Sequence, residues 1–262
     1  MSAYTEDLFD VSGKTALVTG GSRGIGLMIA RGLLQAGARV IVSSRKQADL
    51  EAAARELAEL GDCVAIPADV SEPESVNELA GATRERFGEL DILVNNAGAN
   101  WGAPLEEFPP SAWDRTWHTN VAGVFNLTVA LLPALRAAAA ARPPARVINI
   151  GSIDALRVPW FENYSYSASK AGVHMLTRHL AQRLAPEQIT VNAIAPGPFE
   201  SKMLAFVLDD PEQREQLETQ VPLGRIGRQD DVAGLTLMLA SRAGAYLTGT
   251  EIPLDGGITG CG

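Results

Sequence analysis

The 262-residue sequence predicts an α/β fold: a single domain built on a doubly wound parallel sheet of about seven strands. Two observations predict it. Short apolar runs alternate with longer helical segments along the whole chain, and this alternation is typical of βαβ units with right-handed crossovers. In addition, no linker, repeat or shift in composition divides the sequence, so we expect residues 1–262 to form one domain.

The expected strands are short apolar runs, and several of them end in glycine or small polar residues. They cover residues 14–19, 39–43, 63–68, 90–94, 146–150, 189–194 and 251–254. Pro67 interrupts the third run, which places that strand near an edge of the sheet. Residues 1–12 precede the first strand and are expected to form a loose arm.

The expected helices show apolar residues at helical spacing, and several end at glycine. They cover residues 25–37, 46–60, 71–87, 111–140, 164–184 and 230–240. The longest apolar stretch, 121–135, is interrupted by Asn126, Thr128 and Pro133. It is shorter than the ~20 residues that a membrane span needs, so we interpret it as a core helix. Residues 198–228 are expected to be irregular, with short helical pieces.

Composition and charge argue against several classes of function. The net charge of −9 argues against nonspecific binding to nucleic acid or anionic membranes. Cys63 and Cys261 are isolated and lack metal-ligand spacing, as do the three histidines, so no metal site is expected. The acidic N-terminus does not resemble a signal peptide. Free thiols and the missing signal peptide predict a cytoplasmic protein.

The turn Gly20-Gly-Ser-Arg-Gly-Ile-Gly26 follows the first expected strand and opens a helix. Backbone N–H groups and a helix N-terminus in such a turn can bind a pyrophosphate. The spacing differs from G-x-G-x-x-G, and a plain tight turn is the alternative. The place of the turn at the first βα junction favours phosphate binding, and the expected contacts are Gly20, Ser22, Arg23, Gly24, Ile25 and Gly26.

Residues after the other strands complete a predicted dinucleotide site. Ser44 and Arg45 follow the second strand where an acidic residue would bind the ribose of NAD, so a 2′-phosphate and hence NADPH are favoured over NADH. The alternative for Arg45 is the solvated start of a helix. The remaining expected contacts follow the third, fourth and sixth strands: Asp69 and Val70 at the adenine, then Asn96, Ala97, Gly98, Pro196 and Gly197.

Tyr166 and Lys170 are the candidate catalytic pair. Residues four apart lie on one face of a helix, and a nearby cation lowers the pKa of a phenol. A lysine in water would not suffice, so the chemistry needs a low-dielectric cleft and a second positive charge, such as an oxidised nicotinamide. The alternative is a pair on a solvated helix face.

Taken together, these motifs resemble those of the classical short-chain dehydrogenases/reductases. They occur in family order over nearly the whole chain: Thr19-Gly-x-x-x-Gly-x-Gly26, Asn95-Asn-Ala-Gly98, Asn120, Ser152, Tyr166-x-x-x-Lys170 and Pro196-Gly197. Within the family the chain is most similar to NADPH-dependent 3-oxoacyl (β-ketoacyl) reductases of the rhamnolipid-biosynthesis type. The resemblance implies a Rossmann-like fold, NADPH as cofactor and reduction of a carbonyl to a secondary alcohol.

The resemblance also implies residue roles. Tyr166 would protonate the carbonyl oxygen, Lys170 would lower the pKa of Tyr166 and bind the nicotinamide ribose, and Ser152 would donate a hydrogen bond to the substrate oxygen. Asn120 would hold a water that links Lys170 to solvent, and Ser201 would contact the nicotinamide carboxamide. One departure is the spacing of fourteen residues from Ser152 to Tyr166, one more than is common, so the loop between them must bulge.

Substrate and partners are expected from the same resemblance. The favoured substrate is a 3-oxoacyl thioester, because residues 198–228 would form a substrate loop and many apolar residues would line the pocket: Trp101, Trp160, Phe161, Phe199, Met203, Leu204, Phe206 and Leu208. An acyl-carrier protein would need a basic dock, for which the candidates are Arg136, Arg142, Arg178 and Arg183. A coenzyme A ester and a free ketone are the alternatives, and a homotetramer or homodimer is implied.

Two other functions remain open on the sequence. One is a sugar-acid, polyol, steroid or alcohol dehydrogenase of the same family. The other is a sensor that binds NADPH without catalysis, although a sensor has no need of the set Asn120, Ser152, Tyr166 and Lys170.

Overall fold

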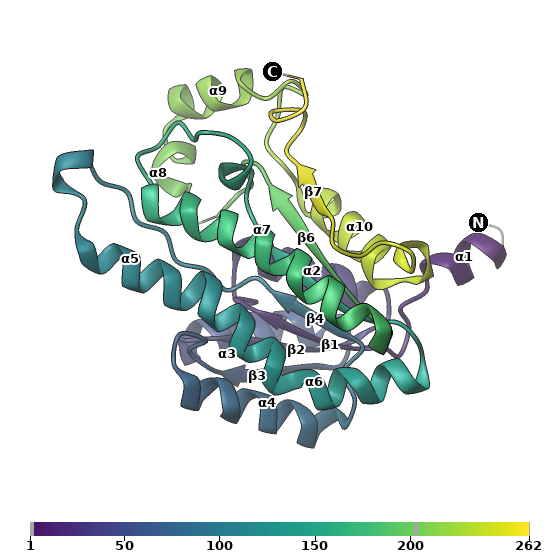
Figure 1. The fold of residues 1–262 in the computed structure, drawn as a ribbon. Coiled ribbons are helices and arrows are strands. Elements are labelled where there is room, and N and C mark those ends of the chain that lie inside the picture. Colours follow the sequence, from purple (N-terminus) through teal and green to yellow (C-terminus); the bar gives the residue numbers. More distant parts are fainter. Residues whose placement is uncertain (1–2, 202–203, 262) are drawn as a thin grey trace.

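The computed structural model describes residues 3–201 and 204–261 and contains the predicted parallel sheet (Figure 1). Within the described residues, seven strands follow the order β3-β2-β1-β4-β5-β6-β7, and every neighbouring pair is parallel. They are β1 Thr15–Thr19, β2 Arg39–Ser44, β3 Cys63–Pro67, β4 Ile92–Asn95, β5 Ala145–Ile150, β6 Ile189–Pro196 and β7 Glu251–Leu254. The prediction that β3 lies at an edge is confirmed.

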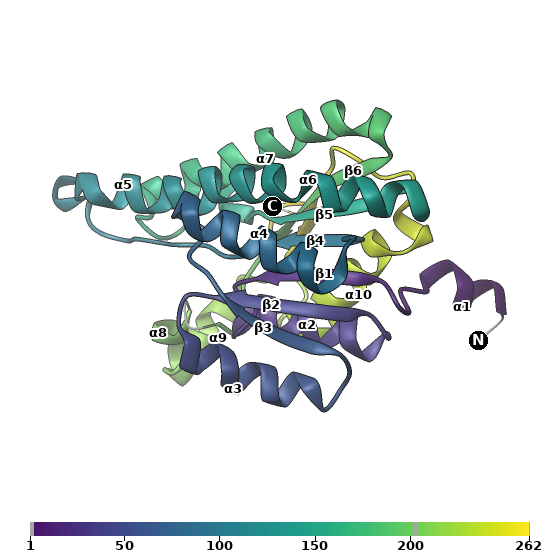
Figure 2. The ribbon, with the colours of Figure 1, turned by 90° about the horizontal axis from the view of Figure 1, so that it is seen from below.

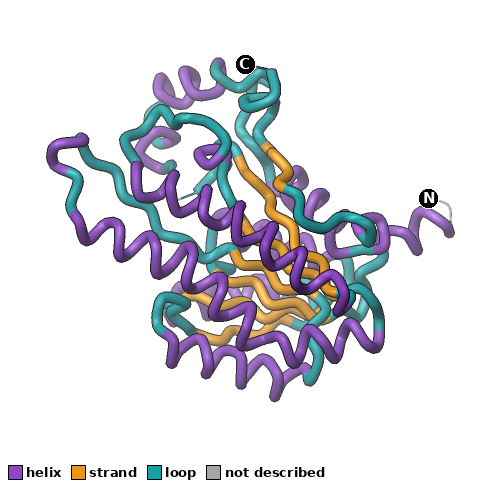
Figure 3. The backbone as a smooth tube through the Cα atoms, viewed as in Figure 1, coloured by secondary structure: helices purple, strands orange, loops and turns teal. Residues whose placement is uncertain are grey.

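Helices cover both faces of the sheet. Figure 2 shows α4, α6 and α7 on one side of the strands and α2, α3 and α10 on the other, and Figure 3 shows the loops that join them. The bounds are α1 Ala3–Phe9, α2 Gly24–Gln35, α3 Gln47–Ala58, α4 Pro73–Phe87, α5 Pro110–Trp117, α6 Gly123–Ala141, α7 Tyr164–Leu184, α8 Ala205–Leu208, α9 Pro211–Thr219 and α10 Gln229–Ala240.

The hydrophobic core has two halves, one on each face. Successive side chains of a strand point to opposite faces, so Leu17 packs with the α4, α6 and α7 side while Ala16 and Val18 pack with the α2, α3 and α10 side. All three are fully buried. Burial on both faces explains why the strands read as nearly continuous apolar runs.

One expectation about the helices needs correction, and another is confirmed. Residues 1–12 are not simply a loose arm, because Ala3–Phe9 forms α1, which Asp7 ties to Arg242 by an ion pair. The long helix runs from Pro110 to Ala141 and passes the length and hydropathy test for a membrane span, as core helices also do. Its residues Leu127, Leu131 and Leu135 are buried in the core, which accords with the predicted core helix.

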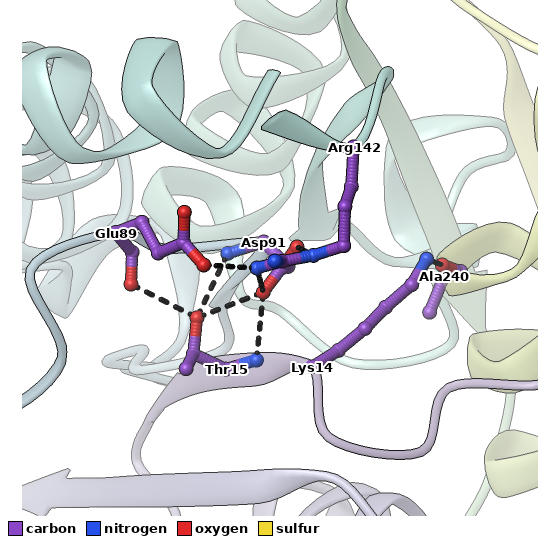
Figure 4. A network of polar contacts seen from close by, with 6 residues as sticks. All are labelled: Lys14, Thr15, Glu89, Asp91, Arg142 and Ala240. Carbon is purple, nitrogen blue, oxygen red and sulfur yellow. Dashed lines mark hydrogen bonds and ion pairs between the residues drawn. The ribbon is translucent and has the colours of Figure 1, made fainter. Parts of the chain in front are cut away.

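A polar network closes the amino-terminal end of the sheet (Figure 4). The Asp91 carboxylate accepts hydrogen bonds from the backbone N–H of Thr15 at 2.9 Å and its hydroxyl at 3.0 Å. Arg142 donates to both carboxylate oxygens of Asp91 at 3.2 Å and also pairs with Glu89. Lys14 donates to the Ala240 carbonyl at 2.9 Å. These contacts join β1, β4, α6 and α10 at the end opposite to the predicted site.

Between β6 and α10 the chain forms a separate cover over the carboxyl ends of the strands. The short helices α8 and α9 lie in this segment, and Val207, Leu217 and Ile226 form a small hydrophobic cluster of their own. The segment is therefore irregular with short helical pieces, as the sequence predicts.

Candidate active site

A cavity of about 1220 Å³ opens at the carboxyl ends of the strands. From β1 the strand order runs outward through β2 and β3, and from β4 it runs the other way, so the two directions separate between β1 and β4. Ligands of open parallel sheets bind at such a switch point. The strand order therefore places the cavity where the sequence places the site.

The glycine-rich turn forms one wall of the cavity. Gly20 and Gly24 have φ of +66° and +54°, values that side chains other than glycine rarely adopt. The Thr19 hydroxyl accepts hydrogen bonds from the N–H groups of Asn96 and Ala97, each at 3.0 Å. This joins the turn after β1 to the loop after β4 and leaves the backbone of both facing the cavity.

Gly26 does not line the cavity, unlike the other predicted glycines. A Cβ atom there would lie 2.4 Å from the Asn96 amide nitrogen and 2.4 Å from the Gly20 carbonyl oxygen. The absence of a side chain at Gly26 thus lets α2 pack onto the turn. Its role is close packing behind the wall, and the predicted cofactor contact is not seen in the lining.

The wall after β2 suits a phosphorylated ribose. The hydroxyl oxygens of Ser43 and Ser44 are buried in the cavity wall, and neither has a hydrogen-bond partner in the described part of the chain. Arg45 is half-exposed and lies 3.8 Å from the Asp69 carboxylate. Arg23 also lines the cavity. Two unused hydroxyls beside two guanidinium groups fit the 2′-phosphate side of NADPH.

Asp69 also shapes its own loop. One carboxylate oxygen accepts hydrogen bonds from the backbone N–H of Ser71 at 3.0 Å and from its hydroxyl at 2.6 Å. The other oxygen faces Arg45. Asp69 therefore stabilises the loop that leads to Ser71 and also lines the cavity wall, next to Val70.

Tyr166 and Lys170 meet in the same cavity, on α7. Their exposed fractions are 9% and 4%, so the alternative of a solvated helix face is excluded for these residues. The Lys170 ammonium nitrogen lies 5.6 Å from the centre of the Tyr166 ring and donates to the Ile150 carbonyl at 2.7 Å. Strand β5 thus holds the ammonium group in place.

Burial dominates the protonation of the pair. Burial raises the pKa of Tyr166 to about 12, a hydrogen bond with Ser152 opposes the rise, and the Asp154 charge adds to it. Burial also lowers the pKa of Lys170 to about 8. On balance the protein's own groups therefore raise the pKa of Tyr166. Lowering this pKa toward neutrality needs a further positive charge, such as an oxidised nicotinamide.

Ser152 follows β5 directly and is buried beside Tyr166. The loop between them accommodates its fourteen-residue spacing with a 3₁₀ turn, Ile153–Ala155, whose N-cap is Ser152: its hydroxyl accepts from the Asp154 N–H at 3.1 Å. Asp154 lines the cavity, and burial raises the pKa of its carboxyl group while a hydrogen bond from Asn163 opposes the rise. No motif marks Asp154 in the sequence, so its place in the cavity could not be predicted.

Tyr164, the other tyrosine of this stretch, has a different environment. Its hydroxyl donates to Glu162 at 2.8 Å, and its ring packs edge-on against Phe108. Tyr164 does not line the cavity among the described residues. The geometry therefore favours Tyr166 for chemistry.

Asn120 lies in a π-helical turn, His118–Ala122, between α5 and α6, and such turns are frequent at functional sites. Its amide oxygen accepts from the Ala99 N–H at 2.7 Å, and its amide nitrogen donates to the Ala99 carbonyl at 2.9 Å and to the Ser169 hydroxyl at 2.8 Å. Asn120 therefore holds the loop after β4 against α7 behind the cavity wall, and the predicted water stays a prediction.

Most of the predicted site residues line the cavity. Among those predicted for catalysis or cofactor binding, all but Gly26 and Asn120 line the cavity: Gly20, Ser22, Arg23, Gly24, Ile25, Ser44, Arg45, Asp69, Val70, Asn96, Ala97, Gly98, Ser152, Tyr166, Lys170, Pro196, Gly197 and Ser201. Among the described residues, no group of three His, Cys, Asp or Glu side chains could hold a metal.

The predicted apolar pocket is only partly assembled. Trp160, Phe161, Phe199 and Leu204 line the cavity, whereas Trp101 does not. Met203 and the side chains of Phe206 and Leu208 lie outside the described part of the structure. Other residues that line the cavity are marked by no motif in the sequence: Asn100, Arg115, Thr119, Ile153, Asn163 and Leu217.

Comparison with known proteins identifies the family of this chain. A family model described as enoyl-(acyl carrier protein) reductase matches residues 20–259. The chain belongs to the short-chain dehydrogenase/reductase family. It is 49% identical over 249 residues to the rhamnolipids biosynthesis 3-oxoacyl-[acyl-carrier-protein] reductase of Pseudomonas aeruginosa, with 95% of this chain and 97% of that protein covered.

A solved structure and one further relative extend the comparison. The RhlG/NADP active-site complex of Pseudomonas aeruginosa superposes with a TM-score of 0.94 at 48% identity, covering 97% of this chain and 99% of that one. The 3beta-hydroxysteroid dehydrogenase 1 of Eggerthella lenta is 38% identical over 255 residues, with 95% of each chain covered. The expected family resemblance is confirmed, and so is the Rossmann-like fold.

Proposed function

We propose that the protein reduces a ketone to a secondary alcohol with NADPH. The observation that carries the proposal is the meeting of Ser152, Tyr166 and Lys170 in one cavity whose other wall is the glycine-rich turn. Bound NADPH would supply the hydride. Ser22, Arg23, Ser44 and Arg45 would hold its phosphates, as the cations and unused hydroxyls of that wall suggest.

Each residue of the pair then has a defined task. Tyr166 donates its proton to the carbonyl oxygen as that oxygen gains charge, and Ser152 stabilises the charge with a hydrogen bond. A phenol with a pKa raised to about 12 keeps its proton at neutral pH, which suits reduction of a ketone. Lys170 supplies positive charge beside the phenol, and a water near Asn120 would return the proton from solvent.

We infer that the substrate is a 3-oxoacyl thioester. Trp160, Phe161, Phe199 and Leu204 give the cavity an apolar region that fits an acyl chain. The Pseudomonas relative, named as a 3-oxoacyl-[acyl-carrier-protein] reductase, supports the same substrate class. Residues 198–228 would act as the substrate loop, since Phe199, Leu204 and Leu217 of this segment reach the cavity wall.

The thioester could be carried by an acyl-carrier protein or by coenzyme A. The arginines that are expected to form a basic dock distinguish the two carriers. Arg136 and Arg183 both pair with Glu187, and Arg178 pairs with Glu251. Arg142 is engaged by Glu89 and Asp91. Each of these four guanidinium groups already pairs with a carboxylate of the same chain, so these four arginines offer an acidic carrier protein little free positive charge. We therefore favour a coenzyme A ester over an acyl-carrier protein.

NADPH oxidation by the purified protein tests the proposal. Acetoacetyl-CoA, longer 3-oxoacyl-CoA esters, the matching acyl-carrier-protein esters, a 3-ketosteroid and 5-ketogluconate form the panel. We expect the highest kcat/KM with a long 3-oxoacyl-CoA ester. Turnover of only the steroid or only the sugar acid would show that the substrate is not an acyl thioester. NADPH binding without turnover of any carbonyl compound would indicate a sensor.

Assembly and location complete the proposal. The thiols of Cys63 and Cys261 are free, which suits the reducing cytoplasm where we place the protein. A homotetramer or homodimer is expected from the family, and the mass in solution by light scattering tests it.

A further inference from the structure

Helix α7 presents three residues at four-residue spacing to the end of β5: Tyr166, Lys170 and His174. Each of them meets a different residue of the segment 150–152. Lys170 donates to the Ile150 carbonyl at 2.7 Å, and Tyr166 lies beside Ser152, whose hydroxyl lowers the pKa of the phenol against the effect of burial. His174 lies against the residue between them, Gly151.

The contact between His174 and Gly151 is close. A Cβ atom at Gly151 would lie 2.1 Å from the Nε2 atom of His174 and 2.7 Å from its Cδ2 atom, distances that real Cβ contacts do not reach. Gly151 is absent from the described glycines with positive φ, so the backbone conformation does not demand a glycine there. The imidazole ring demands it. On its other side Gly151 donates its N–H to the Ile194 carbonyl at 2.7 Å.

The His174 ring is confined in its place. The residue is 4% exposed, and its Nε2 atom is buried without a hydrogen-bond partner in the described part of the chain. Burial lowers the pKa of His174, and the charges of Lys170 and Arg178 on α7 lower it further, while the Glu251 carboxylate on β7 opposes them. A protonated ring would place an N–H donor against Gly151 without an acceptor, which is costly for a buried group. The ring is therefore neutral at pH 7.

We propose that His174 is a positioning residue for the reduction: its neutral ring packs on Gly151 and fixes the backbone that carries the Ser152 hydroxyl and the Ile150 carbonyl. The inference rests on the proposed function. His174, the third of the three residues on this face of α7, thereby gains a role that no sequence motif marks. A shift of Gly151 would displace both the hydrogen-bond donor for the substrate and the acceptor that holds Lys170.

A double-mutant cycle tests the contact. We expect His174→Ala to lower kcat by roughly 10- to 100-fold, a loss typical of small misplacements of reacting groups, with the Kd for NADPH within about twofold of the wild type. Gly151→Ala should lose more than about 100-fold, because its methyl group overlaps the ring. The double variant should recover to the level of His174→Ala, since the overlap is then gone.

Exposed His179 on the same helix provides the control, and His179→Ala should retain wild-type kcat. An unchanged kcat for His174→Ala, or a double variant no better than Gly151→Ala, would overturn the proposal. Because an alanine at 174 leaves a cavity, thermal unfolding and NADPH binding show whether the variant is folded, and His174→Phe supplies a second, ring-sized replacement.

The pH profile separates positioning from mere packing. In the wild type, kcat should fall only at a pH below the ordinary histidine pKa of about 6.5, because burial lowers the pKa of His174. In His174→Phe that acid limb should be absent, while His179→Ala should keep it. An acid limb retained by His174→Phe would assign it to another group and reject the role of the neutral ring.

Nitrogen-15 NMR of the wild type measures the protonation state of the His174 imidazole without any substrate. It should show a neutral His174 whose Nε2 carries no proton at pH 7, and a protonated Nε2 would contradict the inference. If the wild type reduces no ketone at all, the proposed function fails, whereas this spectrum still decides the state of His174.

Discussion

The ammonium nitrogen of Lys170 lies 5.6 Å from the centre of the Tyr166 ring, and both side chains are buried. Lys170 is held by the Ile150 carbonyl, and no carboxylate pairs with it among the described residues. A buried cation without a counter-ion costs folding free energy, and such strain is common where a site must stabilise negative charge. The phenolate of Tyr166 after proton transfer is that charge.

The pH dependence of stability should report this buried cation. The pKa of Lys170 falls from 10.5 in the unfolded chain to about 8 in the fold, so between these pH values only the unfolded chain holds the proton. The wild type therefore gains stability as the pH rises through this window. Lys170→Met lacks the penalty, so its free energy of unfolding should exceed that of the wild type at pH 7 by up to about 3 kcal/mol.

Urea unfolding of both proteins at pH 7 and pH 10 measures the effect. The advantage of Lys170→Met should shrink toward pH 10. Lys46 is exposed, so Lys46→Met should show no such pH-dependent difference. A constant difference between Lys170→Met and the wild type across this range would contradict the shift.

Ser152→Ala should impair the chemical step selectively. Removing one hydrogen-bond donor from a site of developing negative charge typically lowers kcat by about 10²–10³-fold. The Kd for NADPH should change little, because Ser152 acts on the substrate oxygen. Ser111 is exposed on α5, and Ser111→Ala should match the wild type. A similar kcat for Ser152→Ala and the wild type would remove Ser152 from the mechanism.

Arg45→Asp should change the cofactor preference. The guanidinium group beside the unused hydroxyls of Ser43 and Ser44 would bind the 2′-phosphate, and an aspartate there would repel it and bind the ribose hydroxyls of NADH. We expect the NADPH/NADH ratio of kcat/KM to fall at least about tenfold, given the strength of one charge-assisted hydrogen bond. Arg55→Asp, at an exposed position of α3, should leave the ratio unchanged. An unchanged ratio for Arg45→Asp would show that Arg45 does not bind the 2′-phosphate.

The network in Figure 4 should matter for stability and not for catalysis. Asp91 is 3% exposed, and its loss leaves the Thr15 N–H without its acceptor and the Arg142 guanidinium with Glu89 alone. Asp91→Ala should therefore lower the free energy of unfolding by about 2–3 kcal/mol, with KM unchanged. Asp62→Ala removes a more exposed carboxylate that pairs with Arg39 and Arg86, and it should cost less than about 1 kcal/mol. Equal losses for the two variants would refute the distinction.

Most of the fold could be predicted because each strand and helix carries its own local pattern. The apolar runs around Leu17 and Leu93 are buried on both faces, as parallel strands require, and Pro67 correctly marked an edge strand. The helix Ala3–Phe9 was missed, because its sequence has no buried residue to give an apolar stripe. Its contact with Arg242 depends on the folded chain.

The cavity residues after the strands could be predicted because the carboxyl ends of parallel strands share one edge of the sheet. The helical spacing of Tyr166 and Lys170 indicates a pair on one helix face, and the family motifs around it single the pair out as catalytic. Asp154, Asn100 and Leu217 could not be predicted, since no motif in the sequence marks them and only the folded chain brings them to the cavity. Gly26 and Gly151 show a further limit: both glycines permit close packing, against Asn96 and His174, and such contacts exist only in three dimensions.

The central claim is that Tyr166 donates the proton to the substrate carbonyl, and Tyr166→Phe tests it most directly. This change removes one hydroxyl and keeps the ring, so the Kd for NADPH should stay within about twofold. The kcat for reduction of the best 3-oxoacyl thioester should fall by at least about 10²–10⁴-fold, the usual contribution of a positioned acid. Tyr164→Phe, which removes the neighbouring hydroxyl bonded to Glu162, should retain activity. Turnover by Tyr166→Phe at the wild-type rate would contradict the account.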